Sequence, residues 1–309
     1  MVRSIHSSRI IARSGRVRVI WKYRVVFINR PAPIKSFERA AYPNDQRPRV
    51  ASTFSTPCEN SRFNPLGVAR MKTIGLIGGM SWESTLHYYQ RINELVAARL
   101  GGLHSARLLL WSVEFAEIAR LQHADDWDAA GRILADAARR LEHAGAEGLL
   151  ICANTMHRVA PAVEAAVSVP VLHLADITAH ALLADGHRSA ALLGTRFTMA
   201  QPFYRERLER HGLSINVPTP EEQAALHQII FDELVKGRVE AASRERFITI
   251  MRRMHTAGAQ AVILGCTEFG MLLRAGDAPD IPRVDTTELH CQAAVDWMLA
   301  ENSGHIGAT

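Results

Sequence analysis

The sequence predicts an α/β fold class with two pseudo-symmetric lobes, each a parallel sheet flanked by helices, and with a cleft between them. Short apolar runs alternate with amphipathic segments of helical period, which is typical of parallel α/β sheets. The apolar runs end in glycine-containing loops. Similar pieces also recur at almost one spacing, because Gly78 and Gly194 lie 116 residues apart and Cys152 and Cys266 lie 114 apart.

The first half of the pattern starts at Met71. Its expected strands are residues 73–77, 108–113, 148–151 and 170–174, and its expected helices are residues 84–100 and 129–144. Gly78 begins a tight loop after the first strand, and Gly101 and Gly145 stand where glycine ends a helix. These elements form the first predicted lobe, residues 71–171, which residues 286–309 complete.

The pattern restarts near residue 189. Its expected strands are residues 189–193 and 261–264, and its expected helices include residues 202–205, 221–235 and 243–256. Gly258 stands before its last strand as Gly145 stands before a strand of the first half. Parallel strands need helical crossovers of one hand, so we expect residues 172–285 to form a second lobe built like the first.

Residues 1–70 differ from the rest in composition. They hold 14 Lys and Arg against 3 Asp and Glu, whereas the remainder holds 22 against 28. Residues 16–27 alternate like a strand, but no partner strand or turn signal follows, and a proline-rich linker composition comes next. We expect a basic, disordered leader without a catalytic role. A transit peptide, a basic interaction tail and an upstream extension before a working start at Met71 are the alternatives.

Composition also limits the partners and the compartment. The mildly acidic remainder gives no reason to expect nucleic-acid binding. No run of about 18 uncharged apolar residues is present, so we expect no membrane span. Four isolated cysteines in 309 residues do not form a disulfide framework, which favours a reducing compartment and hence a cytoplasmic location.

Two cysteines stand at predicted strand ends, where ligands bind in open parallel sheets. Cys152 and Cys266 each precede a predicted helix, whose N-terminus would lower the thiol pKa and favour the reactive thiolate. Pseudo-symmetric lobes would bring the two thiols face to face across the cleft, where we expect the active site. Such a pair suits a reaction that removes a proton from one face of a carbon and returns one to the other, which is racemisation.

The alternative for each thiol is a structural role, because a single cysteine is more often a small buried apolar residue. Because Cys152 and Cys266 recur at equivalent strand ends, a catalytic role is favoured for both. Cys58, in the leader, and Cys291, inside an apolar helix, are interpreted as structural.

Other chemistries have weaker signals. There is no Cys-x-x-Cys, and no cluster with metal-ligand spacing, so we expect no metal. The glycines at 75, 78 and 79 lack dinucleotide spacing, and no phosphate loop is present. After residue 70 the only lysines are Lys72 and Lys236, and neither is well placed for a pyridoxal phosphate Schiff base. We therefore expect no cofactor.

The motifs at 71–85, 152–157 (Cys-Ala-Asn-Thr-Met-His), 193–195 (Leu-Gly-Thr) and 265–268 (Gly-Cys-Thr-Glu) resemble the aspartate/glutamate racemase family, in its broad-specificity bacterial branch. The resemblance covers about residues 71–299. It implies a cofactor-independent isomerase that interconverts L- and D-amino acids, with Cys152 and Cys266 as its two bases. The residues that it implies for substrate binding are Met80, Gln122, Asn154, Thr155, Thr195, Thr267 and Glu268.

Some points stay open at this level. Glu268 either orients or deprotonates Cys266, or caps a helix. Racemases of the cell-wall glutamate type resemble this pattern but carry Asp-Ser in the first loop and His after the second Cys-Thr, and this chain has Gly78-Gly79 and Glu268 there. The candidates for a cationic subsite are Arg91, Arg158, Arg196 and Arg205. The expected partner is a small amino-acid substrate, with a homodimer left open.

Three alternative enzymes share the same lobes, and one alternative is not an enzyme. The enzymes are a hydantoin racemase, a decarboxylase and a maleate isomerase, the last of which uses one cysteine as a nucleophile. The other alternative is a non-catalytic amino-acid-binding protein. Product analysis by chiral chromatography separates a racemase from a binding protein.

Overall fold

The computed structural model describes residues 10–13, 16–21, 24–29, 70–274 and 276–300. The chain divides into two units, Met1–Arg62 and Phe63–Thr309. Among the residues described, no helix has the length and apolar character needed to cross a bilayer. Cys58 lies outside the described residues.

The described part of the first unit is a small antiparallel sheet. Its strands are β1 (Ile10–Arg13), β2 (Arg16–Trp21) and β3 (Arg24–Asn29), in the order β1-β2-β3. Residues 16–27 were expected to form a lone strand in a disordered leader, and the structure corrects this, because β2 pairs on both sides. The many Val and Ile residues here have high strand propensity, so a ladder forms where the sequence showed no turn signal. The rest of the expected leader lies outside the described residues.

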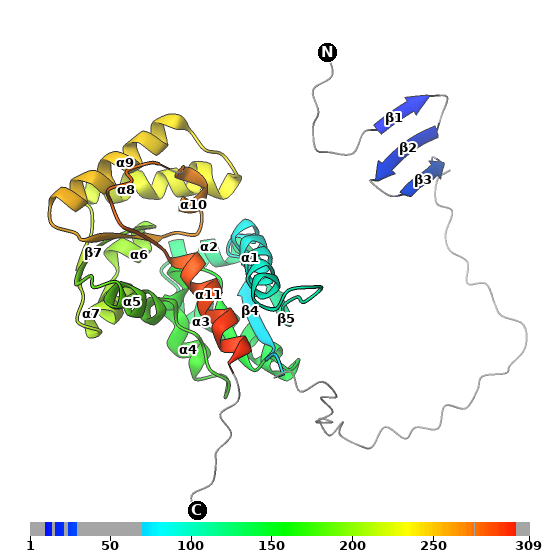
Figure 1. Cartoon of the computed structure of the whole chain (residues 1–309), viewed down its shortest axis with the longest axis horizontal. Helices are drawn as coiled ribbons and strands as arrows, with labels where there is room; N and C mark the ends of the chain where they lie inside the picture. The colour runs from blue at the N-terminus through cyan, green and yellow to red at the C-terminus, as the bar shows by residue number, and fades with distance from the viewer. Residues whose placement is uncertain (1–9, 14–15, 22–23, 30–69, 275, 301–309) are drawn as a thin grey trace, which may run out of the picture. The chain divides into compact units, whose positions relative to one another are not determined.

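The second unit contains two parallel sheets flanked by helices, which confirms the predicted fold class (Figure 1). The first sheet has the order β5-β4-β6. Its strands are β4 (Ile74–Gly78), β5 (Leu108–Ser112) and β6 (Gly148–Ile151). The helices of this half are α1 (Trp82–Leu100), α2 (Phe115–His123), α3 (Trp127–His143), η1 (Thr155–Val159) and α4 (Ala160–Glu164).

Local sequence explains where these helices begin and end. The Ser81 side chain caps α1 by accepting a hydrogen bond from the Ser84 backbone N–H. Gly101 is the C-cap of α1, at a φ of 71°, a value that favours glycine. Gly145 follows the C-cap of α3 at a φ of 98°, as the sequence predicted.

The second sheet has the order β10-β9-β7-β8 and is also parallel throughout. Its strands are β7 (Ser189–Gly194), β8 (Ser214–Asn216), β9 (Ala261–Gly265) and β10 (Arg283–Asp285). The helices around it and after it are α5 (Leu174–Ala184), α6 (Arg196–Ala200), α7 (Pro202–Arg210), α8 (Pro220–Gln228), α9 (Ala241–Thr256), α10 (Phe269–Leu272) and α11 (Thr286–Leu299).

Two predicted elements differ from the structure. Residues 170–174 are not a strand: Val171 makes an isolated bridge to Leu149, and α5 begins at Leu174 because the His173 side chain caps it. The helix expected over residues 221–235 is interrupted, because α8 passes into a π-helical turn, Ile229–Glu233, and a 3₁₀ turn, Leu234–Lys236. Gly237 ends this run at a φ of 68°.

The carboxyl-terminal helix packs back on the first sheet. Cys291, Val295 and Met298 of α11 share one buried apolar cluster with Ile74 of β4 and Tyr88 of α1. Figure 1 shows α11 beside α1. This packing supports the proposal that residues 286–309 complete the first lobe, although residues 301–309 lie outside the described part.

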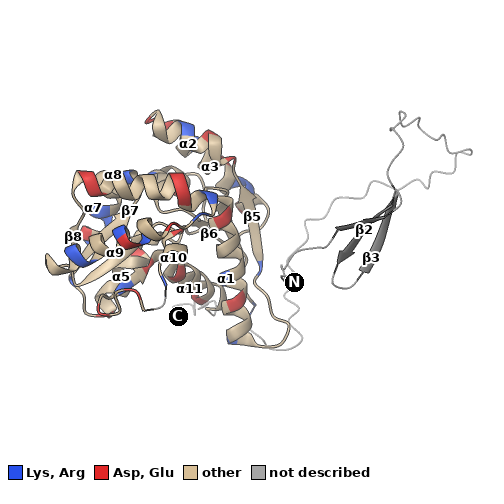
Figure 2. Ribbon diagram, turned by 90° about the horizontal axis from the view of Figure 1, so that it is seen from above, with Lys and Arg blue, Asp and Glu red and all other residues tan. Residues whose placement is uncertain are grey.

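Charged residues of both signs cover the outer helices. Figure 2 shows basic and acidic residues side by side on these helices. Several form ion pairs on the surface, such as Arg140 with Asp136 at 2.7 Å. Exposed pairs of this kind contribute little to stability.

Candidate functional site

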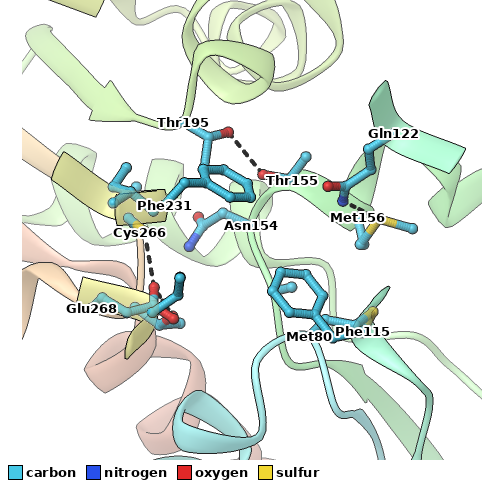
Figure 3. A pocket seen from close by; sticks show the side chains of 15 residues that line it. Met80, Phe115, Gln122, Asn154, Thr155, Met156, Thr195, Phe231, Cys266 and Glu268 are labelled. Atoms are coloured by element: carbon cyan, nitrogen blue, oxygen red, sulfur yellow. Dashed lines mark hydrogen bonds between the residues drawn. The ribbon is translucent and has the colours of Figure 1, made fainter. Parts of the chain in front are cut away.

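A pocket forms where the segments after β4, β6, β7 and β9 converge (Figure 3). These segments follow the carboxyl ends of strands in both sheets, which is where the pattern of alternating strands and helices predicts a ligand site. All seven residues expected to bind a substrate line it. They are Met80, Gln122, Asn154, Thr155, Thr195, Thr267 and Glu268.

The structure brings only one of the two expected cysteines to this pocket. Cys266 lines it, and the first lobe contributes Ala153 instead of Cys152. Cys152 is fully buried in the apolar cluster that contains Tyr88 and Cys291. This corrects the expectation that Cys152 and Cys266 face each other across the cleft.

The strand registers explain the difference. In the first sheet Ile77 pairs with Ile151, so Cys152 follows at the level of Gly78. In the second sheet Gly194 pairs with Gly265, and Cys266 comes one residue later. Since Gly78 and Gly194 hold equivalent places, the first-lobe equivalent of Cys266 is the residue after Cys152. Successive side chains of an extended segment point to opposite sides, so one residue decides between pocket and core.

The Cys266 thiol is bound to a carboxylate. Its Sγ donates a hydrogen bond to Glu268 Oε2 at 2.9 Å (Figure 3). Burial raises the pKa of the Cys266 thiol well above its usual range, and the negative charge of Glu268 raises it further. Burial likewise raises the pKa of Cys152. The sequence predicted lowered values from helix N-termini, but α10 has only four residues and begins at Phe269.

Glu268 is the most densely bonded side chain of the site. Its Oε1 accepts hydrogen bonds from Ser81 Oγ at 3.0 Å and Ser84 Oγ at 2.8 Å, and its Oε2 accepts one from Thr267 Oγ1 at 2.7 Å. Ser81 and Ser84 belong to the first lobe, so the carboxylate of the second lobe is held by the opposite lobe. Neither serine was expected in the site, because Ser-x-x-Ser at a helix start is typical of capping.

Asn154 carries an unsatisfied acceptor into the pocket. Its Nδ2 donates to Thr286 Oγ1 at 3.1 Å, whereas its Oδ1 is buried without a partner. A buried polar atom without a hydrogen bond is costly, so this oxygen is suited to accept a donor from a ligand. Beside it, Thr155 Oγ1 shares hydrogen bonds with Thr195 Oγ1 at 3.0 Å and Thr198 Oγ1 at 3.1 Å.

The remaining wall is apolar and neutral. Phe115, Ile230, Phe231 and Val235 line it, and no sequence motif had singled them out. Gln122 lies on this side, where its Nε2 contacts Met156 Sδ at 3.0 Å (Figure 3).

None of the four arginines expected as candidates for a cationic subsite lines the pocket. Arg91 is bound to Glu288 at 2.6 Å, and the guanidinium of Arg158 stacks over Trp127. The polar side chains that line the pocket are therefore hydroxyls, amides, the Cys266 thiol and the Glu268 carboxylate, and none of those described is cationic.

The described residues contain no cluster of three His, Cys, Asp or Glu side chains that could hold a metal. Neither lysine of the described body lines the pocket. The Lys72 ammonium lies over the Trp297 ring, before β4 begins and hence at the sheet end opposite the pocket. The Lys236 ammonium lies 3.8 Å from Asp232. The pocket therefore offers no Schiff-base lysine to pyridoxal phosphate.

Comparison with known proteins gives a consistent result. The Asp/Glu/Hydantoin racemase family profile matches residues 77–294. A candidate Asp/Glu racemase from Yersinia pestis, known as a crystal structure, is 47% identical with a TM-score of 0.70, over 74% of this chain and all of that one. A glutamate racemase of Koribacter versatilis is 30% identical over 58% of this chain, and the match spans 62% of the relative's length. The broad-specificity amino-acid racemase RacX of Bacillus subtilis is 22% identical over 74% of this chain and all of RacX.

Proposed function

Because the chain belongs to the Asp/Glu/hydantoin racemase family, we propose that it inverts the α-carbon of a free amino acid by proton transfer through Cys266, without a cofactor. The observation that carries this proposal is the Cys266 thiol, hydrogen-bonded to the Glu268 carboxylate at 2.9 Å on the pocket wall. A thiol with an adjacent carboxylate can become a thiolate when the carboxylate takes its proton.

The neutral polar residues of the pocket hold the amino-acid backbone. The free Oδ1 of Asn154 accepts a hydrogen bond from the substrate ammonium. The hydroxyls of Thr155 and Thr195 donate to the α-carboxylate, together with backbone N–H groups after β9, at Cys266 and Thr267. These donors stabilise the negative charge that moves onto the carboxylate when the α-proton leaves.

Proton transfer begins at the Cys266 thiol. The S–H bond of Cys266 breaks as its proton moves to Glu268, leaving a thiolate. The thiolate then takes the α-hydrogen, so that the C–H bond breaks, an S–H bond forms and the electron pair spreads into the substrate carboxylate. Inversion requires a proton to return on the opposite face, where the first lobe presents Ala153, Asn154 and Thr155. A hydroxyl on that face gives its proton to the carbon, and the alkoxide left behind recovers the proton held by Glu268 once the product leaves. A hydroxyl is a weaker acid than a thiol, so we expect this return to limit the rate.

We therefore propose a one-thiol form of the reaction. A two-thiol form would require Cys152 to leave the apolar cluster around Tyr88. The two forms make opposite predictions for Cys152→Ser.

A chiral assay in deuterated water tests the proposed function. Each member of a panel of L- and D-amino acids is incubated with the protein, followed by chiral chromatography and by loss of the α-proton signal. We expect α-exchange and inversion for at least one amino acid, and we expect Cys266→Ser to remove both. A panel in which no α-proton exchanges would contradict the proposal.

One observation favours a second candidate. A single thiol in the pocket also suits an isomerase of the maleate kind, in which Cys266 adds to a carbon as a nucleophile. Mass spectrometry of the protein mixed with substrate separates the two, because only the nucleophilic route gives a covalent adduct on the Cys266 peptide.

An exposed apolar stripe on α1 supports a homodimer. Trp82, Leu86 and Tyr89 follow one helix face and are each more than half exposed. Apolar groups gathered on one face commonly mark a contact with another protein. Light scattering should give the mass of two chains, and Leu86→Glu should give the mass of one.

A cytoplasmic location is also part of the proposal. The three described cysteines, Cys152, Cys266 and Cys291, are free thiols. Free thiols are typical of a reducing compartment. Fractionation of cells that express the full chain should recover it with cytosolic markers.

A further inference from the structure

A second cavity, of about 570 Å³, lies on the other side of Glu268. Its lining includes Ser84 and His87 of α1 and Asp285 at the start of α11. Among the described residues, only Thr267 and Glu268 line both this cavity and the substrate pocket. These two residues therefore form the wall between the two spaces.

The proposed reaction requires a path by which Cys266 can release protons, and this wall lies next to the thiol. Cys266 must release its proton before it can act as a base, and it must later release the hydrogen taken from the substrate. Cys266 and Glu268 are the only titratable side chains that line the described pocket. Because the thiol donates its hydrogen bond to Glu268 Oε2, Glu268 is the first acceptor of a proton that leaves Cys266.

Hydrogen bonds continue from Glu268 to the second cavity. Glu268 Oε2, the atom bonded to the thiol, also bonds Thr267 Oγ1 at 2.7 Å. Thr267 Oγ1 is in turn hydrogen-bonded to Ser84 Oγ, and Ser84 lines the cavity. The chain from Cys266 Sγ to the cavity is thus carboxylate, hydroxyl, hydroxyl, without a gap.

We infer that the second cavity is the proton outlet of the site, reached from Cys266 through Glu268, Thr267 and Ser84. The S–H bond breaks as an O–H bond forms on Glu268. The hydroxyls of Thr267 and Ser84, which donate to the Glu268 carboxylate at rest, turn away from it as it becomes protonated. Glu268 then passes a proton to Thr267 Oγ1 while Thr267 passes its own to Ser84, and Ser84 passes its own to water in the cavity. Each hydroxyl gains one proton and loses one, so only the thiol and the solvent change. This inference rests on the proposed function for its biological use, but the relay can be measured without turnover.

Two serines provide a matched pair of variants. Ser81 and Ser84 both donate to Glu268 Oε1, but only Ser84 lines the second cavity. Glu83 supplies a second control, because it lines the cavity and lies outside the hydrogen-bond chain. Ser84→Ala and Glu268→Gln interrupt the relay, whereas Ser81→Ala and Glu83→Gln leave it connected.

Infrared spectroscopy follows the thiol directly. The protein is transferred into deuterated water, and the conversion of the Cys266 S–H band is timed, this band being the one that is missing in Cys266→Ser. We expect conversion at least about tenfold slower in Ser84→Ala and Glu268→Gln than in the wild type, and unchanged in Ser81→Ala and Glu83→Gln. Circular dichroism shows whether each variant is folded.

The outcomes separate the two proposals. If the S–H band converts equally fast in the wild type, Ser84→Ala and Glu268→Gln, the second cavity is not the outlet. If Ser81→Ala slows conversion as much as Ser84→Ala, the serines act by positioning Glu268 and the outlet is again rejected. If the band behaves as expected but no amino acid loses its α-proton, the outlet is correct and the racemase proposal fails.

Discussion

Ala153 of the first lobe occupies the sheet position that Cys266 occupies in the second. Cys266 follows Gly265, which pairs with Gly194 at the end of β7. Ala153 follows Cys152, which lies level with Gly78 at the end of β4. Both also line the substrate pocket. The two lobes are therefore similar in backbone and unequal in chemistry, since one presents a thiol where the other presents a methyl group.

This relationship predicts a gain of activity. Ala153→Cys places a second thiol on the pocket face opposite Cys266, where it can return a proton faster than a hydroxyl. A general acid contributes roughly 10²–10⁴-fold, so we expect inversion to rise at least about tenfold in the chiral assay. The substitution adds only a sulfur atom. A thermal unfolding curve like that of the wild type would show that the pocket accommodates it. An unchanged or lower inversion rate in a folded variant would contradict the equivalence of the two positions.

The native cysteines should differ sharply in their response to substitution. Cys266→Ser replaces the proton-transferring thiol by a hydroxyl of much higher pKa, so we expect a loss of at least about a hundredfold in kcat. Cys152→Ser changes a buried core atom outside the pocket. It should keep most of the activity and lower stability by about 1–3 kcal/mol, because the hydroxyl is buried among apolar groups.

Chiral assays and urea unfolding of both variants check this contrast. Cys291→Ser is the matched control, because Cys291 lies in the same cluster and was never a catalytic candidate. Cys152→Ser that unfolds normally but loses a hundredfold in activity would show that Cys152 does reach the substrate, and the two-cysteine mechanism would then be restored.

The sequence predicted the fold more completely than the site. Alternating apolar runs and glycine stops gave β4, β6, β7 and β9 to within a residue or two, because a buried strand and a helix stop depend on local chemistry. The strands β8 and β10 were missed, since three residues are too few for a period. Residues 170–174 contain apolar side chains, but a side-chain cap at His173 starts a helix there instead.

The two cysteines were predicted from their places at strand ends and the substrate contacts from the family resemblance, and the position of the first cysteine was misjudged by one residue. The spacing of 114 between Cys152 and Cys266 is close to the glycine spacing of 116, but the loop lengths differ. A shift of one residue turns a side chain from pocket to core. Register is a property of paired strands and could not be derived from spacing alone. The roles of Ser81 and Ser84 were hidden for a similar reason, since their partner Glu268 lies more than 180 residues away.

The leader is predicted to be dispensable for catalysis. The described residues that line the pocket all belong to the second unit, Phe63–Thr309. A protein that begins at Met71 should therefore keep kcat and KM within about twofold of the full chain. Chiral assays on both proteins at equal concentration of folded protein provide the comparison. A large loss of turnover with unchanged circular dichroism would assign the first unit a role in the reaction.

Three buried histidines lie behind the pocket wall. His157 donates from Nδ1 to the Ala153 carbonyl at 2.8 Å, and its ring lies 4.6 Å from the ring of His173 and 5.9 Å from that of His290. Burial lowers the pKa of His157 to about 4 and that of His290 to about 3, and it lowers the pKa of His173 as well. All three are therefore neutral in the folded protein at neutral pH.

These histidines predict a loss of stability in mild acid. Their pKa values are lower in the folded than in the unfolded chain, where histidine titrates near 6.5, so the unfolded chain binds more protons as the pH falls. The contribution of these histidines to the free energy of unfolding has its full value above about pH 6.5. It decreases as the pH falls from there toward pH 4, by about 1.4 kcal/mol per pH unit for each histidine. Urea unfolding at pH 7.5 and 5.5 measures the difference.

The substitution that isolates this effect is His290→Gln, which keeps a polar side chain near Tyr88 and cannot titrate. It should lower stability at pH 7.5, because the hydrogen bond of His290 Nε2 to the Leu172 carbonyl is disturbed. Its free energy of unfolding should nevertheless fall less between pH 7.5 and 5.5 than that of the wild type, by about 1.4 kcal/mol. Equal pH dependence in the wild type and His290→Gln would show that His290 is not held neutral by its burial.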